Sequence, residues 1–149
     1  MRYVLDTNIL IHAIRKSAIF EQINQKYALF SGQHELLISA VSIGELESFA
    51  LQNQWGQKRM NDMAALLTEL KPISVSANRP LIRTYAEIDA FSQGKHPTLT
   101  LPNSARNMGK NDLWIATTAA IHEATLLSMD ADFTHLDAVF FYFDQISAN

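Results

Sequence analysis

Short apolar runs alternate along the chain with longer segments in which apolar residues recur every three or four positions. The runs at residues 3–5, 36–38 and 125–128 have the length of buried strands, and two more strands are predicted near 73–75 and 139–143. The longer segments predict helices. Strands that alternate with helices indicate a parallel sheet covered on both faces, so we expect a three-layer α/β/α sandwich with a short, mainly parallel central sheet.

The ends of several predicted helices carry side-chain signals. The polar residues 6–8 cap a helix that follows the first strand directly. Ser42 is predicted to open a later helix, with Glu45 three positions on, at the spacing of a capping box. Asn111 is predicted to cap the helix before the fourth strand, and the Gly-, Pro-, Asn- and Ser-rich segment 92–110 is predicted to be a loop. Further helices are predicted over residues 18–30, 57–70 and 80–91.

The composition is that of a well-packed globular protein. Of the 149 residues, 48% are hydrophobic and 18% are charged, which excludes a disordered chain, and we expect residues 1–149 to form one domain. No apolar run is long enough to cross a bilayer or to form the core of a secretory signal, so we expect a cytoplasmic protein with no membrane partner. Because there is no cysteine, any metal ion must be held by oxygen or imidazole ligands.

The formal net charge of −3 does not exclude a nucleic-acid partner. Phosphate backbones are usually bound by an excess of Lys and Arg. However, the local charge decides phosphate binding more than the total does, and one bound divalent cation changes the formal charge from −3 to −1. A carboxylate site that holds a hard cation is therefore compatible with a nucleic-acid substrate.

Four acidic residues lie where predicted strands end or predicted helices begin: Asp6, Glu45, Asp112 and Asp130. Because the strand-to-helix junctions of a parallel sheet open on one edge, these carboxylates can form one oxygen-lined site. Like charges this close raise one another's pKa unless a cation compensates, and Mg²⁺ prefers such oxygen ligands. The pattern therefore predicts a metal site suited to phosphate chemistry.

Each of these acids also has a simpler structural interpretation. Asp6 suits a helix N-cap, and Glu45 suits a capping box. Asp112 suits the first turn of a helix, and Asp130 suits a turn. On the residues alone, the joint metal site and the structural interpretation are about equally supported. The five histidines show no metal-ligand spacing and are assigned no role.

Four segments resemble, in order, the motifs of PIN domains, most closely those of the VapC-type toxins of type II toxin–antitoxin systems. They are residues 4–10 (VLDTNIL), 39–46 (SAVSIGEL), 109–116 (GKNDLWIA) and 126–133 (LLSMDADF). The resemblance covers nearly the whole chain. The metal-binding and catalytic residues that it implies are Asp6, Glu45, Asp112 and Asp130. The residues expected to order this site are Thr7, Asn8 and Asn111.

The resemblance implies an endoribonuclease that depends on Mg²⁺ or Mn²⁺. Such an enzyme hydrolyses RNA phosphodiesters with a metal-activated water and leaves a 5′-phosphate and a 3′-hydroxyl. Asp6 and Asp112 are the expected direct ligands. The resemblance also implies an antitoxin protein as partner, in a homodimer or a hetero-oligomer. The apolar stripe of residues 60–70 is expected to be chiefly core, but together with Phe49 and Leu51 it could form a groove for an amphipathic partner helix.

The fourth motif departs from the family pattern. Ser128 and Met129 stand in place of the Thr and basic residue that often precede the fourth acid. Either Asp130 or Asp132 could therefore be the acid that lies closer to the metal, and we rank Asp130 first.

The predicted loop at residues 92–110 is longer than in the smallest relatives. It contains no acid, and Arg106 and Lys110 near its end are candidates for positioning phosphate beside Asp112. An ordinary solvated loop is an equally supported interpretation, although adjacency to Asp112 favours Lys110.

Two rival functions come from other classes. A non-catalytic PIN-like module that binds RNA or protein would retain the fold, but the intact set of four acids argues against it. A receiver or phosphatase domain of the phosphoryl-transfer type would place a second acid two positions after Asp6, where this chain has Asn8.

Overall fold

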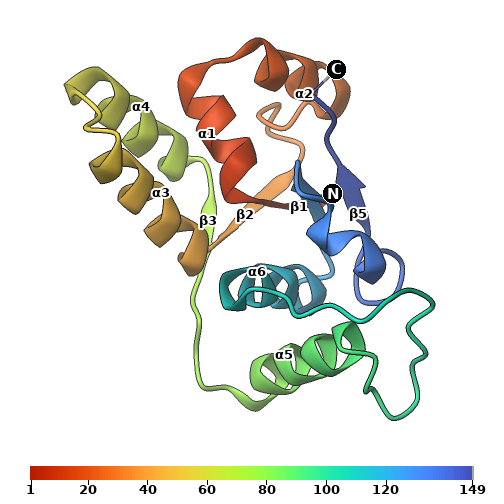
Figure 1. Cartoon of the computed structure of the whole chain (residues 1–149). Coiled ribbons are helices and arrows are strands. Elements are labelled where there is room, and N and C mark those ends of the chain that lie inside the picture. Colours follow the sequence, from red (N-terminus) through yellow and green to blue (C-terminus); the bar gives the residue numbers. More distant parts are fainter. Residues whose placement is uncertain (149) are drawn as a thin grey trace.

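The computed structural model describes residues 1–148. Its strands are β1 (Arg2–Leu5), β2 (Glu35–Ser39), β3 (Lys71–Ile73), β4 (Thr125–Ser128) and β5 (Phe143–Gln145). They form one sheet in the order β3-β2-β1-β4-β5, and every neighbouring pair is parallel (Figure 1). The connecting helices are α1 (Thr7–Arg15), α2 (Ala18–Tyr27), α3 (Ala40–Gln52), α4 (Gln57–Thr68), α5 (Arg79–Ser92), α6 (Lys110–Ile121) and the 3₁₀ helix η1 (Ala131–Leu136).

Two hydrophobic cores lie on opposite faces of the sheet. Side chains alternate between the faces of a strand, so Val4 of β1 enters one core while Tyr3 and Leu5 enter the other. The core around Val4 is covered by α5, α6 and η1, and the core around Leu5 is covered by α1 to α4 (Figure 1). This arrangement confirms the predicted α/β/α sandwich, with a central sheet that is wholly parallel.

The central strand brings distant segments together at one edge of the sheet. Val4 of β1 is aligned with Leu37 of β2 on one side and with Leu126 of β4 on the other. Because all three strands are parallel, their carboxyl ends lie at the same edge, where ligand sites of such sheets form. The segments that follow these strands contain most of the acids singled out in the sequence.

The two edge strands differ from their predicted positions. β3 begins at Lys71 and includes Pro72, which lacks a backbone N–H and is tolerated because β3 lies at the edge of the sheet. The strand predicted at 139–143 is wrong: β5 covers Phe143–Gln145, and the residues before it form a turn with an isolated bridge from Asp137 to Phe141.

The start of α3 also differs from the prediction. The helix begins at Ala40, and the hydroxyl of Ser39 accepts a hydrogen bond from the N–H of Val41 as its N-cap. Ser42 is buried inside the helix, so the predicted capping box of Ser42 and Glu45 is wrong.

Smaller shifts occur at two other helix ends. α2 ends at Tyr27, three residues before its predicted end. α6 begins at Lys110 with Gly109 as its N-cap, so Asn111 lies inside the first turn and does not cap it. Within residues 1–148, no helix has the length and hydropathy needed to cross a membrane.

Candidate metal centre

Five acidic residues converge at the carboxyl edge of the sheet. Asp6 directly follows β1, and Asp130 follows β4 as the N-cap of η1. Asp112 and Asp132 lie in the first turns of α6 and η1, and Glu45 lies further along α3. The four residues of the predicted site are therefore joined by Asp132, which the sequence offered only as an alternative to Asp130.

The tightest group of carboxylates consists of Asp112, Asp130 and Asp132. One oxygen of each lies within 4.8 Å of the others, which is close enough for all three to bind one ion. Asp112 and Asp130 are partly buried, and Asp132 is exposed. The hydrogen bond from the Asp132 N–H to Oδ1 of Asp130 (2.9 Å) forms the turn that brings these two acids together.

Asp6 lies deeper, with 6% of its surface exposed. Its Oδ1 accepts a hydrogen bond from the N–H of Thr7 (2.7 Å), and its Oδ2 accepts one from the hydroxyl of Ser128 (2.6 Å). Burial raises the pKa of Asp6 above its ordinary value, although these two hydrogen bonds lower it in part. The fold thus holds this carboxylate in a fixed orientation.

Ser128 connects the first and fourth motifs. Besides donating to Asp6, its hydroxyl oxygen accepts hydrogen bonds from the side-chain amide of Asn8 (3.2 Å) and from the N–H of Asp130 (3.0 Å). The side-chain oxygen of Asn8 in turn accepts a hydrogen bond from the N–H of Met129 (3.2 Å). Ser128 is not among the site residues predicted from the sequence. The available signal was that Ser keeps the hydroxyl of the Thr usual at this position.

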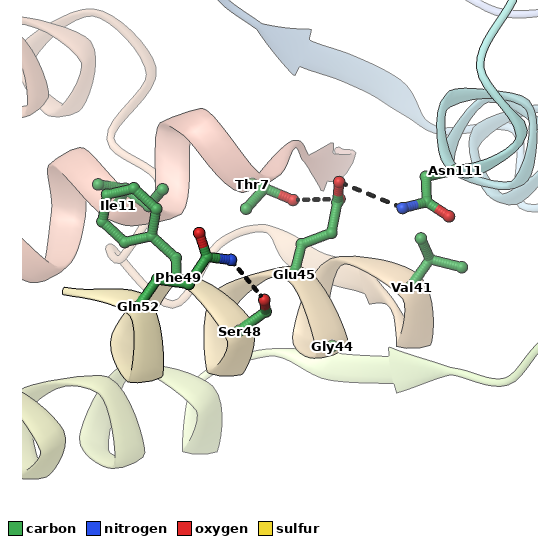
Figure 2. Close-up of a pocket in the computed structure, with 9 residues that line it drawn as sticks. All are labelled: Thr7, Ile11, Val41, Gly44, Glu45, Ser48, Phe49, Gln52 and Asn111. Carbon is green, nitrogen blue, oxygen red and sulfur yellow. Dashed lines mark hydrogen bonds between the residues drawn. The ribbon is translucent and has the colours of Figure 1, made fainter. Parts of the chain in front are cut away.

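Glu45 belongs to the site through contacts across the fold (Figure 2). The hydroxyl of Thr7 donates a hydrogen bond to its Oε1 (2.8 Å), and the side-chain amide of Asn111 donates one to its Oε2 (3.4 Å). Thr7 begins α1 and Asn111 lies in the first turn of α6, so Glu45 links three helices.

The carboxylate of Asp112 is strongly perturbed by its surroundings. Burial is the main cause, and the charges of Asp6, Asp130, Asp132 and Glu45 add to it, raising the pKa of Asp112 to about 7. A divalent cation bound beside Asp112 would favour the ionised form of this carboxyl.

The comparison with protein families settles which kind of domain carries this arrangement. Residues 3–139 match the family model of the PIN domain. The chain belongs to the PIN domain family. PIN domains are in general nucleases that use divalent metal ions. No curated protein is similar enough to this chain to count as a match.

Solved structures similar to this PIN domain include several toxin–antitoxin complexes. VapBC2 from Rickettsia felis, solved with a DNA fragment from its promoter, has a TM-score of 0.73 at 21% identity over 99% of this chain and 100% of that one. VapBC-1 from nontypeable Haemophilus influenzae has a TM-score of 0.67 at 20% identity, and the match covers 97% of this chain and 98% of that one. VapBC-5 from Mycobacterium tuberculosis has a TM-score of 0.60 at 22% identity, and the match covers 99% of this chain and 98% of that one. At these identities the likeness establishes the shared fold.

The acidic site of this PIN domain fits a hard divalent cation. All its charged donors are carboxylate oxygens, which Mg²⁺ and Mn²⁺ prefer, and the sequence has no cysteine to bind a softer metal. Asp112, Asp130 and Asp132 are placed to hold such an ion together. Asp6 accepts one hydrogen bond at each carboxylate oxygen, which leaves lone pairs free to contribute as well.

The loop before α6 is attached to the PIN domain core near Asp132. The N–H of Arg106 donates a hydrogen bond to the carbonyl of Ser92 (2.8 Å), and its guanidinium donates one to the carbonyl of Asp132 (3.4 Å). The Ser92 hydroxyl lies 2.7 Å from Nε2 of His135, which is buried in η1. Burial lowers the pKa of His135 to about 4, so this residue is neutral at pH 7 and acts as a structural link. Lys110, the first residue of α6, is exposed.

Proposed function

We propose that this PIN domain is an endoribonuclease that requires Mg²⁺ or Mn²⁺ and serves as the toxin of a toxin–antitoxin pair. The observation that carries the proposal is the convergence of Asp112, Asp130 and Asp132 within 4.8 Å, with Asp6 and Glu45 beside them. This placement brings charged oxygen ligands together at the carboxyl edge of the sheet, where Asp132 is exposed. The family supports nuclease chemistry for such a site.

The proposed catalytic residues are Asp6, Glu45, Asp112 and Asp130, together with Asp132. When bound, a divalent ion supplies a water of lowered pKa and neutralises charge that develops on the phosphate. The chain's own residues bind and orient the ion and the substrate. Thr7 and Asn111 fix the Glu45 carboxylate, while Ser128 and Asn8 fix the segment that carries Asp130.

Two positive side chains near the acids suit phosphate positioning. Arg106 lines a cleft of about 650 Å³ that also borders Asp132 and includes the polar side chains of Asn103 and Ser104. Lys110 lies two positions before Asp112. Contacts of a backbone phosphate with these cations would offset part of its repulsion from the carboxylates.

The test is cleavage of a panel of structured and unstructured RNAs by the purified protein. We expect cleavage with Mg²⁺ or Mn²⁺, loss of cleavage with a chelator, and products that carry a 5′-phosphate. Cleavage that persists in excess chelator would contradict the metal requirement. Tight RNA binding without cleavage under any metal condition would replace the enzyme by a non-catalytic binding module.

We also propose an antitoxin protein as partner, because the similar structures include complexes of this kind. In the apolar stripe of residues 60–70, Met63 and Leu70 are buried in the core as expected, whereas Leu51 at the end of α3 is 79% exposed. A tagged copy expressed in its native host should retain a small protein encoded beside its gene. Light scattering of the purified protein, alone and with that partner, would distinguish a homodimer from a hetero-oligomer.

A further inference from the structure

A cleft of about 560 Å³ opens directly beside the acidic site, between α1 and α3 (Figure 2). It is lined by Thr7, Ile11, Val41, Gly44, Glu45, Ser48, Phe49, Gln52 and Asn111. Thr7, Glu45 and Asn111 belong also to the acidic site, so a molecule in the cleft would lie next to the reacting centre. The volume falls within the range of small-molecule sites.

The lining residues favour an uncharged occupant with an apolar face. None of the nine described residues that line the cleft carries a positive charge, and Glu45 carries a negative one. The lining residues themselves therefore supply no cation to bind a phosphate. Ile11 and Phe49 form its apolar end (Figure 2), and Phe49 is held by the guanidinium of Arg15, 5.3 Å from its ring centre, and by an edge-on contact with Trp55.

The middle of the cleft presents hydrogen-bonding groups of both kinds. The side-chain amide of Gln52 donates a hydrogen bond to the hydroxyl oxygen of Ser48 (2.8 Å). This contact orients Gln52 and leaves its carbonyl oxygen as an acceptor, with the Ser48 hydroxyl hydrogen as a donor. Paired donors and acceptors of this type recognise the edge of a nucleobase, while apolar and aromatic side chains contact its face.

We infer that the cleft binds the base of the nucleotide next to the scissile phosphate of a single-stranded RNA. Ile11 and Phe49 contact the face of this base, and Ser48 and Gln52 contact its edge and determine sequence preference. The base must be unpaired, because pairing would occupy the edge that these side chains contact. This inference rests on the proposed ribonuclease function.

The experiment compares Gln52→Ala with Gln57→Ala. Both residues are exposed, and each amide donates a 2.8 Å hydrogen bond to the side chain four positions away, but Gln57 lies at the start of α4, outside the cleft. Cleavage of a sequence-randomised pool of short RNAs, followed by sequencing of the products, gives the base preference at each position. We expect Gln52→Ala to reduce the preference at one position beside the cleavage site by about five- to tenfold, and Gln57→Ala to leave it unchanged.

A binding measurement separates this inference from the proposed function. In an Asp112→Asn background, which removes cleavage, the affinities for homopolymers of A, C, G and U are measured with and without Gln52→Ala. Loss of discrimination among the homopolymers supports the subsite. Unchanged discrimination overturns it, whether or not the parent protein cleaves RNA. Release of a bound small protein by Gln52→Ala, with base preference unchanged, would assign the cleft to a protein partner and also overturn the inference.

Discussion

Replacing Asp112 with Asn is expected to lower the rate of RNA cleavage by at least about 100-fold. Asn keeps the size of the side chain but removes the charge from one of the three carboxylates whose oxygens lie within 4.8 Å of one another. RNA binding should persist or strengthen, because the change removes repulsion between the site and the phosphate backbone. The measurement is the single-turnover cleavage rate together with RNA affinity for parent and variant.

The matched control for this change is Asp62→Asn. Asp62 lies on α4, where its carboxylate pairs with Lys58 (3.4 Å) on the surface, away from the five acids. We expect this variant to cleave at the parental rate. Parental cleavage by Asp112→Asn as well would show that the acidic group is not the reacting centre.

Mg²⁺ or Mn²⁺ is expected to stabilise the protein, and more strongly at high pH. At a metal concentration about 100 times the dissociation constant, binding adds about 2.7 kcal/mol to the free energy of unfolding, which corresponds to about 5–10 °C in melting temperature. The pKa of Asp112 is about 7 in the folded protein and 3.8 for the ordinary group. Between these values the metal-free folded protein keeps a proton that the unfolded chain has released, so its stability falls as the pH rises toward 7.

Metal binding requires the ionised carboxylates, so the ion competes with this proton. The metal-induced rise in melting temperature should therefore be small at a pH near the ordinary pKa of an Asp side chain. It should reach its full size at a pH above the pKa of Asp112 in the folded protein. The measurement is a series of thermal melts with metal and with chelator across that range. If the metal raised the melting temperature equally at both ends of this pH range, or equally in Asp112→Asn, the bound ion would lie elsewhere.

The elements that could be predicted from the sequence are those whose ends carry local signals. The β1–α1 junction is the clearest case. Asp6 follows a short apolar run and accepts a hydrogen bond from Thr7, so its place at the sheet edge and the start of the helix both follow from adjacent residues. The buried β4 likewise follows from its apolar residues, which made its carboxyl end a predicted site position.

The contacts of Glu45 could not be found from local spacing. Its partners Thr7 and Asn111 are 38 and 66 positions away in the sequence. The nearby Ser42 made a capping box look sufficient, but the helix begins earlier and Ser42 is buried within it. The tertiary structure thus gives Glu45 a role that its neighbours in the sequence do not indicate.

The misplaced last strand has a different cause. Phe140, Phe141 and Tyr142 have the aromatic composition of a strand, but Phe141 is buried against the core from a turn, in which Ala138 has a positive φ of 61°. Aromatic residues indicate burial here, and the pairing with β4 begins only at Phe143.

The pairing of β1 with β4 also determines when an active site can exist during synthesis. Asp6 and Ser128, which share a hydrogen bond at the centre of the acidic group, are 122 positions apart. A ribosome-bound chain that has emerged only as far as α6 contains Asp6, Glu45 and Asp112, but it has no strand beside β1 on that side and neither Asp130 nor Asp132. For a nuclease of the proposed kind, the active site, and with it the need for an inhibitor, would then arise only after β4 and η1 have emerged.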